Sequence, residues 1–170
     1  MKNSKMSRRR NGGGFVLGVC VASVLALLGA DGRVGAQEGQ GVFITQASLR
    51  LIKLVEAANR DGYVLNENTF SIGGGMLKQS KTEWIKLFEV PLTAGKDYRF
   101  LAAGDADARD VDLQVVDAAG KVVAADAAAD PEALVNFRPT ASGRYIISIR
   151  LYASRENLEC VCMGVVMFKK

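Results

Sequence analysis

Residues 144–152 read RYIISIRLY, and this stretch decides the fold. Every second position from 145 onward carries a large apolar side chain: Tyr145, Ile147, Ile149 and Leu151. Successive side chains of a β-strand point to opposite faces of the sheet. The alternation therefore predicts a strand with one face in a hydrophobic core.

Further β-rich runs lie on both sides of this strand. They cover residues 84–90, 98–102, 111–117, 121–125, 133–137 and 161–168. Turn-forming residues at 93–96, 118–121 and 139–143 leave too little chain for crossover helices, so neighbouring strands are expected to pair antiparallel. The pattern predicts a mostly β protein, an antiparallel β-sandwich of about seven to eight strands, with Trp84 as a core anchor.

The chain before the sandwich is expected to contain one amphipathic helix. Residues 37–44 are rich in Gly and Gln and are interpreted as a linker. Residues 45–60 place one apolar stripe at helical spacing: Ala47, Leu51, Leu54, Val55 and Ala58. Residues 45–82 are thus predicted as a helix followed by an irregular lead-in with weak strands, and Gly73, Gly74 and Gly75 as a flexible turn. The sandwich itself is assigned to residues 83–170.

The N-terminus is predicted to be a signal peptide. Five Lys or Arg residues precede the uncharged, mostly apolar run at 15–28, which is shorter than the roughly 20 residues that span a bilayer. Small residues before Gln37 give a cleavage site after Ala36, so residues 1–36 are assigned to the leader. An uncleaved signal anchor is the alternative. Export predicts an extracellular or periplasmic location.

Charge and composition exclude several functions. The chain has 22 basic and 18 acidic residues, and removal of the leader takes away six basic and one acidic, leaving 16 and 17. A net charge of −1 argues against a nucleic-acid partner and against a membrane partner once the leader is removed. The chain contains no His. Catalytic triads and zinc sites that need an imidazole are therefore excluded.

The sequence resembles a family over residues 83–170. The matching segments are FEVPLTAGKDY at 88–98, DVDL at 110–113, DAAG at 117–120, FRP at 137–139 and GRY at 143–145. Their order and spacing resemble the bacterial pre-peptidase C-terminal domain. The resemblance implies an exported jelly-roll-like β-sandwich that is usually attached to a secreted peptidase and sometimes serves attachment to a substrate or surface. Residues 37–82 are too few to form a peptidase, so we expect a domain of this kind without an attached peptidase.

Acidic residues are concentrated between the predicted strands. The candidates for a calcium site are Asp105, Asp107, Asp110, Asp112 and Asp126. If residues 118–120 close a hairpin, Val115 meets Val123 and Asp112 faces Asp126. Like charges opposite each other in a sheet are destabilising, so this pairing calls for a neutralising Arg109 or a bound Ca²⁺. Solvated acids, some of them paired with Arg109, are the alternative.

Cys160 and Cys162 are the two cysteines that remain after the leader. The sequence leaves four states possible for these cysteines: buried free thiols, a strained local bridge, an intermolecular disulfide or a contact to a soft metal.

The sequence thus predicts an exported, non-catalytic binding or structural module whose partner is a protein or glycan at the cell surface. No catalytic or cofactor-binding residue is assigned, and calcium is the one candidate cofactor. The alternatives are a calcium-stabilised adhesion domain and a carboxylate-dependent glycoside hydrolase.

Overall fold

The computed structural model describes residues 34–65 and 70–170, with side chains from residue 40 onward. Most of the predicted leader therefore lies outside the described residues. The described part holds the helix α1 (Val34–Arg60), the short 3-10 helix η1 (Arg155–Asn157) and nine strands. The strands are β1 (Tyr63–Val64), β2 (Ile72–Leu77), β3 (Ile85–Leu92), β4 (Tyr98–Gly104), β5 (Ala108–Val116), β6 (Val122–Asp126), β7 (Glu132–Phe137), β8 (Gly143–Ser154) and β9 (Cys160–Lys169). No helix in these ranges is long and apolar enough to cross a membrane.

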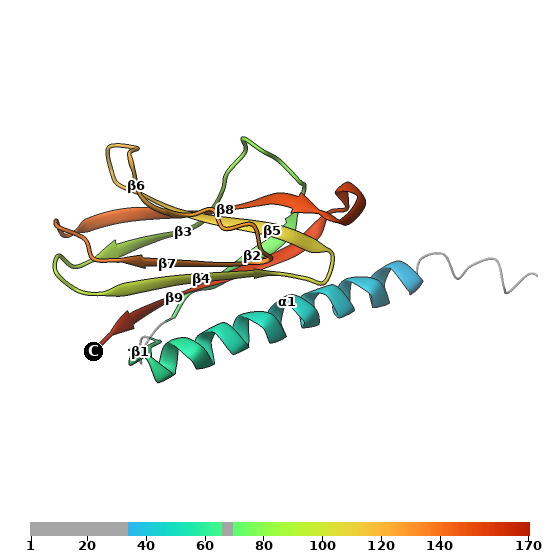
Figure 1. Ribbon diagram of the computed structural model, residues 1–170, viewed down its shortest axis with the longest axis horizontal. Coiled ribbons are helices and arrows are strands. Elements are labelled where there is room, and N and C mark those ends of the chain that lie inside the picture. Colours follow the sequence, from blue (N-terminus) through green and yellow to red (C-terminus); the bar gives the residue numbers. More distant parts are fainter. Residues whose placement is uncertain (1–33, 66–69) are drawn as a thin grey trace, which may run out of the picture. The chain divides into compact units, whose positions relative to one another are not determined.

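The strands form two antiparallel sheets packed face to face, which confirms the predicted sandwich (Figure 1). One sheet has the order β1-β9-β4-β7, and β2 also pairs with β9. The other has the order β3-β8-β5-β6. With β2 counted beside β9, two four-stranded rows face each other and the chain crosses repeatedly between them, as in a jelly roll.

The expectation that neighbouring strands pair with each other is wrong for most of the chain. Among the described strands, β5 and β6 are the one consecutive pair that shares a ladder. The turns at 93–96 and 139–143 instead carry the chain from one sheet to the other. A short connection can cross the narrow gap between packed sheets as readily as it can close a hairpin, so turn length alone does not distinguish the two.

The core lies between the sheets, and β8 supplies its centre. Tyr145, Ile147, Ile149 and Leu151 are all buried, which confirms the predicted inward face of this strand. They pack with residues of β4, β5 and β7 in one apolar cluster. Fully burying a side chain of this size contributes about 1.5–3 kcal/mol.

The helix packs on the outer face of the sheet that contains β4 and β9, where Figure 1 shows its later turns. Ala47, Leu51 and Ala58 of the predicted stripe are buried, and the apolar surface beneath them includes Leu101 and Met167. Residues 37–44, predicted as a linker, belong to this helix. A glycine destabilises a helix by about 1 kcal/mol but does not break it as a proline does. The Gly-rich composition of residues 37–44 was therefore not sufficient to indicate a linker.

The glycine run at 73–75 is the interior of β2, so its prediction as a flexible turn is wrong. A Cβ added at Gly74 would collide with the backbone oxygen of Cys162, and one at Gly73 would lie 2.9 Å from the Phe88 ring. Glycine is needed here because β2 lies unusually close to β9 and to the facing sheet.

Candidate functional site

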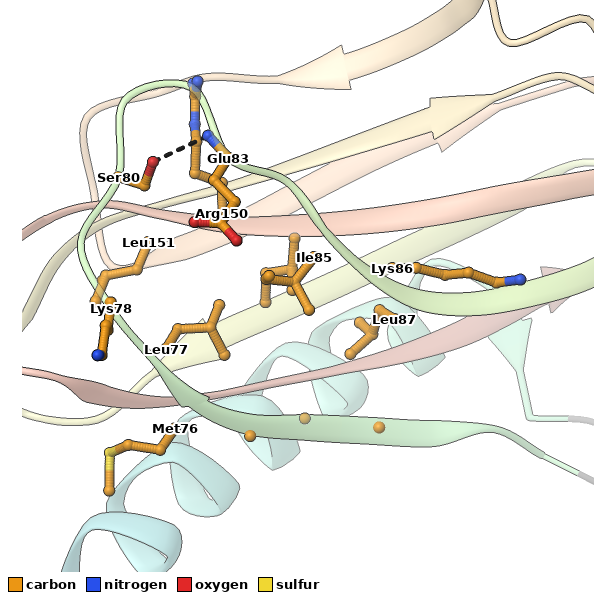
Figure 2. Close-up of a pocket in the computed structure, with 14 residues that line it drawn as sticks. Met76, Leu77, Lys78, Ser80, Glu83, Ile85, Lys86, Leu87, Arg150 and Leu151 are labelled. Atoms are coloured by element: carbon orange, nitrogen blue, oxygen red, sulfur yellow. Dashed lines mark hydrogen bonds between the residues drawn. The ribbon is translucent and has the colours of Figure 1, made fainter.

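A cleft of about 530 Å³ lies between β2, at the edge of one sheet, and β3, at the edge of the other (Figure 2). Its wall on one side is the glycine run of β2. Its apolar lining comes from three strands and consists of Leu77, Ile85, Leu87, Ile149 and Leu151. Figure 2 shows Leu77 directed into the cleft, whereas Met76 leaves the opposite face of β2. This difference follows from the alternation of side chains along a strand.

The rim of the cleft is an ordered connection between β2 and β3. The Ser80 amide donates to the Leu151 carbonyl at 2.9 Å. The Ser80 hydroxyl oxygen accepts hydrogen bonds from the amides of Thr82, at 3.3 Å, and Glu83, at 2.9 Å. The Gln79 side-chain oxygen accepts from the Ser154 amide at 2.8 Å. These bonds fasten the connection to β8.

Arg150 holds the same rim from the side of β8. Its guanidinium donates twice to one oxygen of Asp112, at 2.8 and 2.5 Å, and once to the Lys81 carbonyl at 2.5 Å. It also lies over two rings, with its central carbon 4.4 Å from the centre of Trp84 and 4.9 Å from that of Tyr152. Trp84 is half-buried at the rim, so its prediction as a core anchor is wrong. Apolar neighbours in the sequence did not reveal that a cation covers its ring.

Three of the four charged residues that line the cleft are cations, and each has a carboxylate partner. Lys78, Lys86 and Arg150 line it together with Glu83. Lys78 pairs loosely with Glu159 at 3.7 Å, and Lys86 donates to Glu89 at 2.5 Å. Hydrogen bonds from Lys86 and Arg144 lower the pKa of Glu89 to about 2. Glu89 is thus shared by Lys86 and Arg144, and Arg150 is paired with Asp112, so the cations that the cleft exposes most are the ammonium groups of Lys78 and Lys86.

A second groove, of about 420 Å³, borders the other face of β2. It shares residues 73–76 of β2 with the cleft, so β2 separates two hollows. Ile44 of α1, Ile72 of β2 and Met163 of β9 make its lining apolar. None of the described residues that line this groove is charged.

This site is not evident from the sequence. The glycine run carries no alternation of apolar and polar residues, and such a run predicts a turn. The cleft also combines residues of β2, β3 and β8, which are far apart in the chain. Exposed Ile72 and Met76, both on one side of β2, are the one local signal that could have identified a strand there.

The carboxylates predicted to bind calcium do not form one cluster. Within residues 34–65 and 70–170, no group of three or more Asp, Glu, Cys or His side chains is placed to hold a metal ion. Asp105 is buried and accepts hydrogen bonds from the amides of Asp107, Ala108 and Val161. Asp107 forms an ion pair with Arg155 at 2.5 Å. Ca²⁺ takes about six to eight oxygen ligands, whereas the oxygens of Asp105 and Asp107 are engaged by amides and by Arg155, and calcium stays a prediction.

The predicted pairing of Asp112 with Asp126 is wrong by one residue. Val116 pairs with Val122 as expected. The register then shifts between Val116 and Val115, so that Val115 pairs with Ala124 and not with Val123. Asp126 therefore lies opposite Leu113. Asp112 lies opposite Arg150 on β8, and the cation that neutralises it is Arg150 and not Arg109. An extra residue in one strand shifts every later pair, which residue spacing alone cannot show.

Asp126 and Asp110 have different surroundings. Asp126 accepts hydrogen bonds from the amides of Ala128, at 3.2 Å, and Leu134, at 2.7 Å. Asp110 has a buried oxygen, Oδ1, for which the structure shows no hydrogen-bond partner. Burial and the neighbouring Asp112 carboxylate raise the pKa of Asp110, although Arg150 opposes this shift.

Cys160 and Cys162 are buried free thiols, which was the first of the alternatives left open. Burial raises the pKa of Cys160 to about 12 and also raises that of Cys162. Both therefore stay protonated at neutral pH, and a protonated thiol is a poor nucleophile and metal ligand.

Comparisons with known proteins give little further information. No family model matches the chain, and no curated protein matches it. Among solved structures, it is similar to the CBM22-1–GH10 modules of an endo-1,4-β-D-xylanase 10B from Clostridium thermocellum, solved in complex with xylohexaose. The TM-score is 0.33 and the identity 12%, with 65% of this chain and 26% of the xylanase chain covered. We draw no conclusion about fold or function from this similarity.

Proposed function

We propose that this protein is an exported, non-catalytic binding module, and that the cleft between β2 and β3 is its binding site. The partner is a protein or a glycan at the surface of the cell or outside it. The leader-like N-terminus supports export, and the resemblance of residues 83–170 to the pre-peptidase C-terminal domain supports an attachment role.

The observation that carries the proposal is the cleft itself. It combines an apolar lining with a charged rim, and the rim is fixed by hydrogen bonds to β8 before any ligand arrives. Ligand sites typically combine apolar walls with a few placed polar groups. Preorganisation lowers the entropy cost of binding because fewer groups must be ordered.

Binding is tested by adding the labelled, exported protein back to producing cells that lack it. We expect saturable binding that Ile85→Glu weakens at least about tenfold, because a carboxylate would replace an apolar cleft residue. Leu134→Glu is the matched control, since Leu134 on β7 is 40% exposed and Ile85 is 43% exposed. Equal loss in both variants, or no saturable binding of the parent protein, would contradict the proposal.

Export is tested separately by mass spectrometry of the protein outside the cytoplasm. We expect Gln37 at the N-terminus. An intact leader on a membrane-bound chain would favour the signal anchor instead.

A further inference from the structure

We propose that the free edge of β2 binds an extended peptide segment of a partner protein as an added strand, and that this segment alternates apolar and acidic side chains. The inference rests on the proposed binding function and names the class of ligand that its site takes.

The first support is the unpaired edge of β2. Among the described strands β2 pairs with β9 alone, over six residues from Ile72 to Leu77. In an antiparallel ladder every second residue directs its N–H and C=O away from its partner strand. The outer edge of β2 therefore offers a row of donors and acceptors to another extended chain.

The second support is that the edge across the cleft is blocked, whereas β2 is not. β3 contains Pro91, the charged residues Lys86 and Glu89, and a bulge between Lys86 and Phe88. Each of these features discourages the addition of a strand. β2 has neither a proline nor a charged residue, its pairing with β9 is regular, and Gly73, Gly74 and Gly75 have no side chains to obstruct an approaching chain.

The third support is the pair of hollows that β2 separates. A strand added beside β2 would direct alternate side chains to the two faces of the extended sheet. One set would enter the cleft and the other the apolar groove beside α1, because both hollows border residues 73–76. Backbone hydrogen bonds would then supply affinity, and the two hollows would supply specificity, as in other cases of strand addition.

Charge defines the chemistry of the segment. Arg150 is engaged by Asp112, but the side chains of Lys78 and Lys86 are 84% and 54% exposed and can each reach an acidic side chain in the cleft. The groove, lined by Ile44, Ile72 and Met163, favours apolar ones.

A second copy of this chain fits the edge less well. If β2 paired with its own copy around Gly74, Ile72 would lie opposite Met76 and Gly73 opposite Gly75. Gly73, Gly75 and, at the end of the strand, Leu77 of the copy would then lie on the face of the cleft. The two glycines would leave most of the cleft unfilled, and Lys78 and Lys86 would gain no acidic partner.

The inference is tested with the full exported chain and a fluorescent peptide of about eight residues in which valine and glutamate alternate, long enough to span the six of β2. We expect saturable binding by fluorescence anisotropy, with slower hydrogen exchange at residues 72–77 and no change at 132–137. N-methylation of the alternate peptide residues that face β2 removes about three hydrogen bonds and should weaken binding about a hundredfold. A peptide that alternates valine and lysine should bind more weakly than the original.

Protein variants test the same edge. Met76→Glu should weaken peptide binding about tenfold, whereas Leu134→Glu should not, and the two positions are similarly exposed at 42% and 40%. If Met76→Glu does not fold, the N-methylated peptides still provide the test on the unmodified protein. Equal affinity for the N-methylated peptide and for the parent peptide would overturn the inference. So would a dimer that buries residues 72–77 and does not bind the peptide.

The two proposals fail in different ways. Cell binding that is lost in Ile85→Glu, together with no affinity for any alternating peptide, would overturn strand addition and leave the binding function in place. Absence of saturable cell binding would overturn the binding function itself.

Discussion

Asp105→Asn should destabilise the fold more than any exposed carboxylate change, because Asp105 is the most buried acid described. The residue is 1% exposed. Oδ1 accepts hydrogen bonds from the amides of Asp107, at 2.9 Å, and Ala108, at 3.3 Å, and Oδ2 accepts one from Val161 at 2.6 Å. Asp105 therefore joins the turn between β4 and β5 to the start of β9.

The magnitude follows from this geometry. Asparagine replaces one accepting oxygen with an NH₂ group, so at least one buried amide loses its acceptor and faces another donor. A hydrogen bond to a charged group contributes about 1.5–3 kcal/mol, so we expect a loss of about 3 kcal/mol in the free energy of unfolding. For a domain of this size, that loss lowers the melting temperature by roughly 10 °C.

Urea denaturation measures this loss, and Asp117→Asn is the matched control. Both amides bound by Asp117 donate to Oδ1, which asparagine retains, so the control should change stability by less than about 0.5 kcal/mol. The experiment is run in EDTA and again in calcium. A loss below about 0.5 kcal/mol for Asp105→Asn would refute the structural role. A loss that appears in calcium alone would make Asp105 a metal ligand.

Two further predictions concern titratable groups. The pKa of Asp110 in the folded protein is raised above its ordinary value of 3.8. As pH rises, the unfolded chain therefore loses this proton before the folded protein does, and the free energy of unfolding falls once the pH exceeds 3.8. Asp110→Asn should therefore raise the melting temperature at pH 7 and not at pH 3, and an equal change at both would contradict this. Because burial raises the pKa of Cys160 to about 12 and also that of Cys162, a thiol reagent at pH 8 should modify neither residue in the folded protein and both in urea, as read by peptide mass spectrometry. Rapid modification of the folded chain would show that these thiols are accessible.

Local pattern determined a large part of this fold. Alternation along residues 144–152 predicted the strand β8 and its buried face, and the apolar stripe of residues 45–60 predicted the helix face that packs on the sheet. Both signals arise within one element, because the direction of a side chain depends on the backbone period alone. The sequence alone was therefore sufficient to assign a mostly β sandwich with one helix.

Only the tertiary structure decided which strands are neighbours and what each charged residue binds. The register shift between Val115 and Val116 places Asp126 opposite Leu113, and Arg150 of β8, on the other side of β5 and 38 residues away along the chain, pairs with Asp112. The glycine run became a strand because β9 and the facing sheet lie close enough to require residues without a Cβ. The cleft arises where β2, β3 and β8 meet. Such contacts join distant parts of the chain and depend on packing between elements, whereas sequence patterns report the conformation of one element at a time.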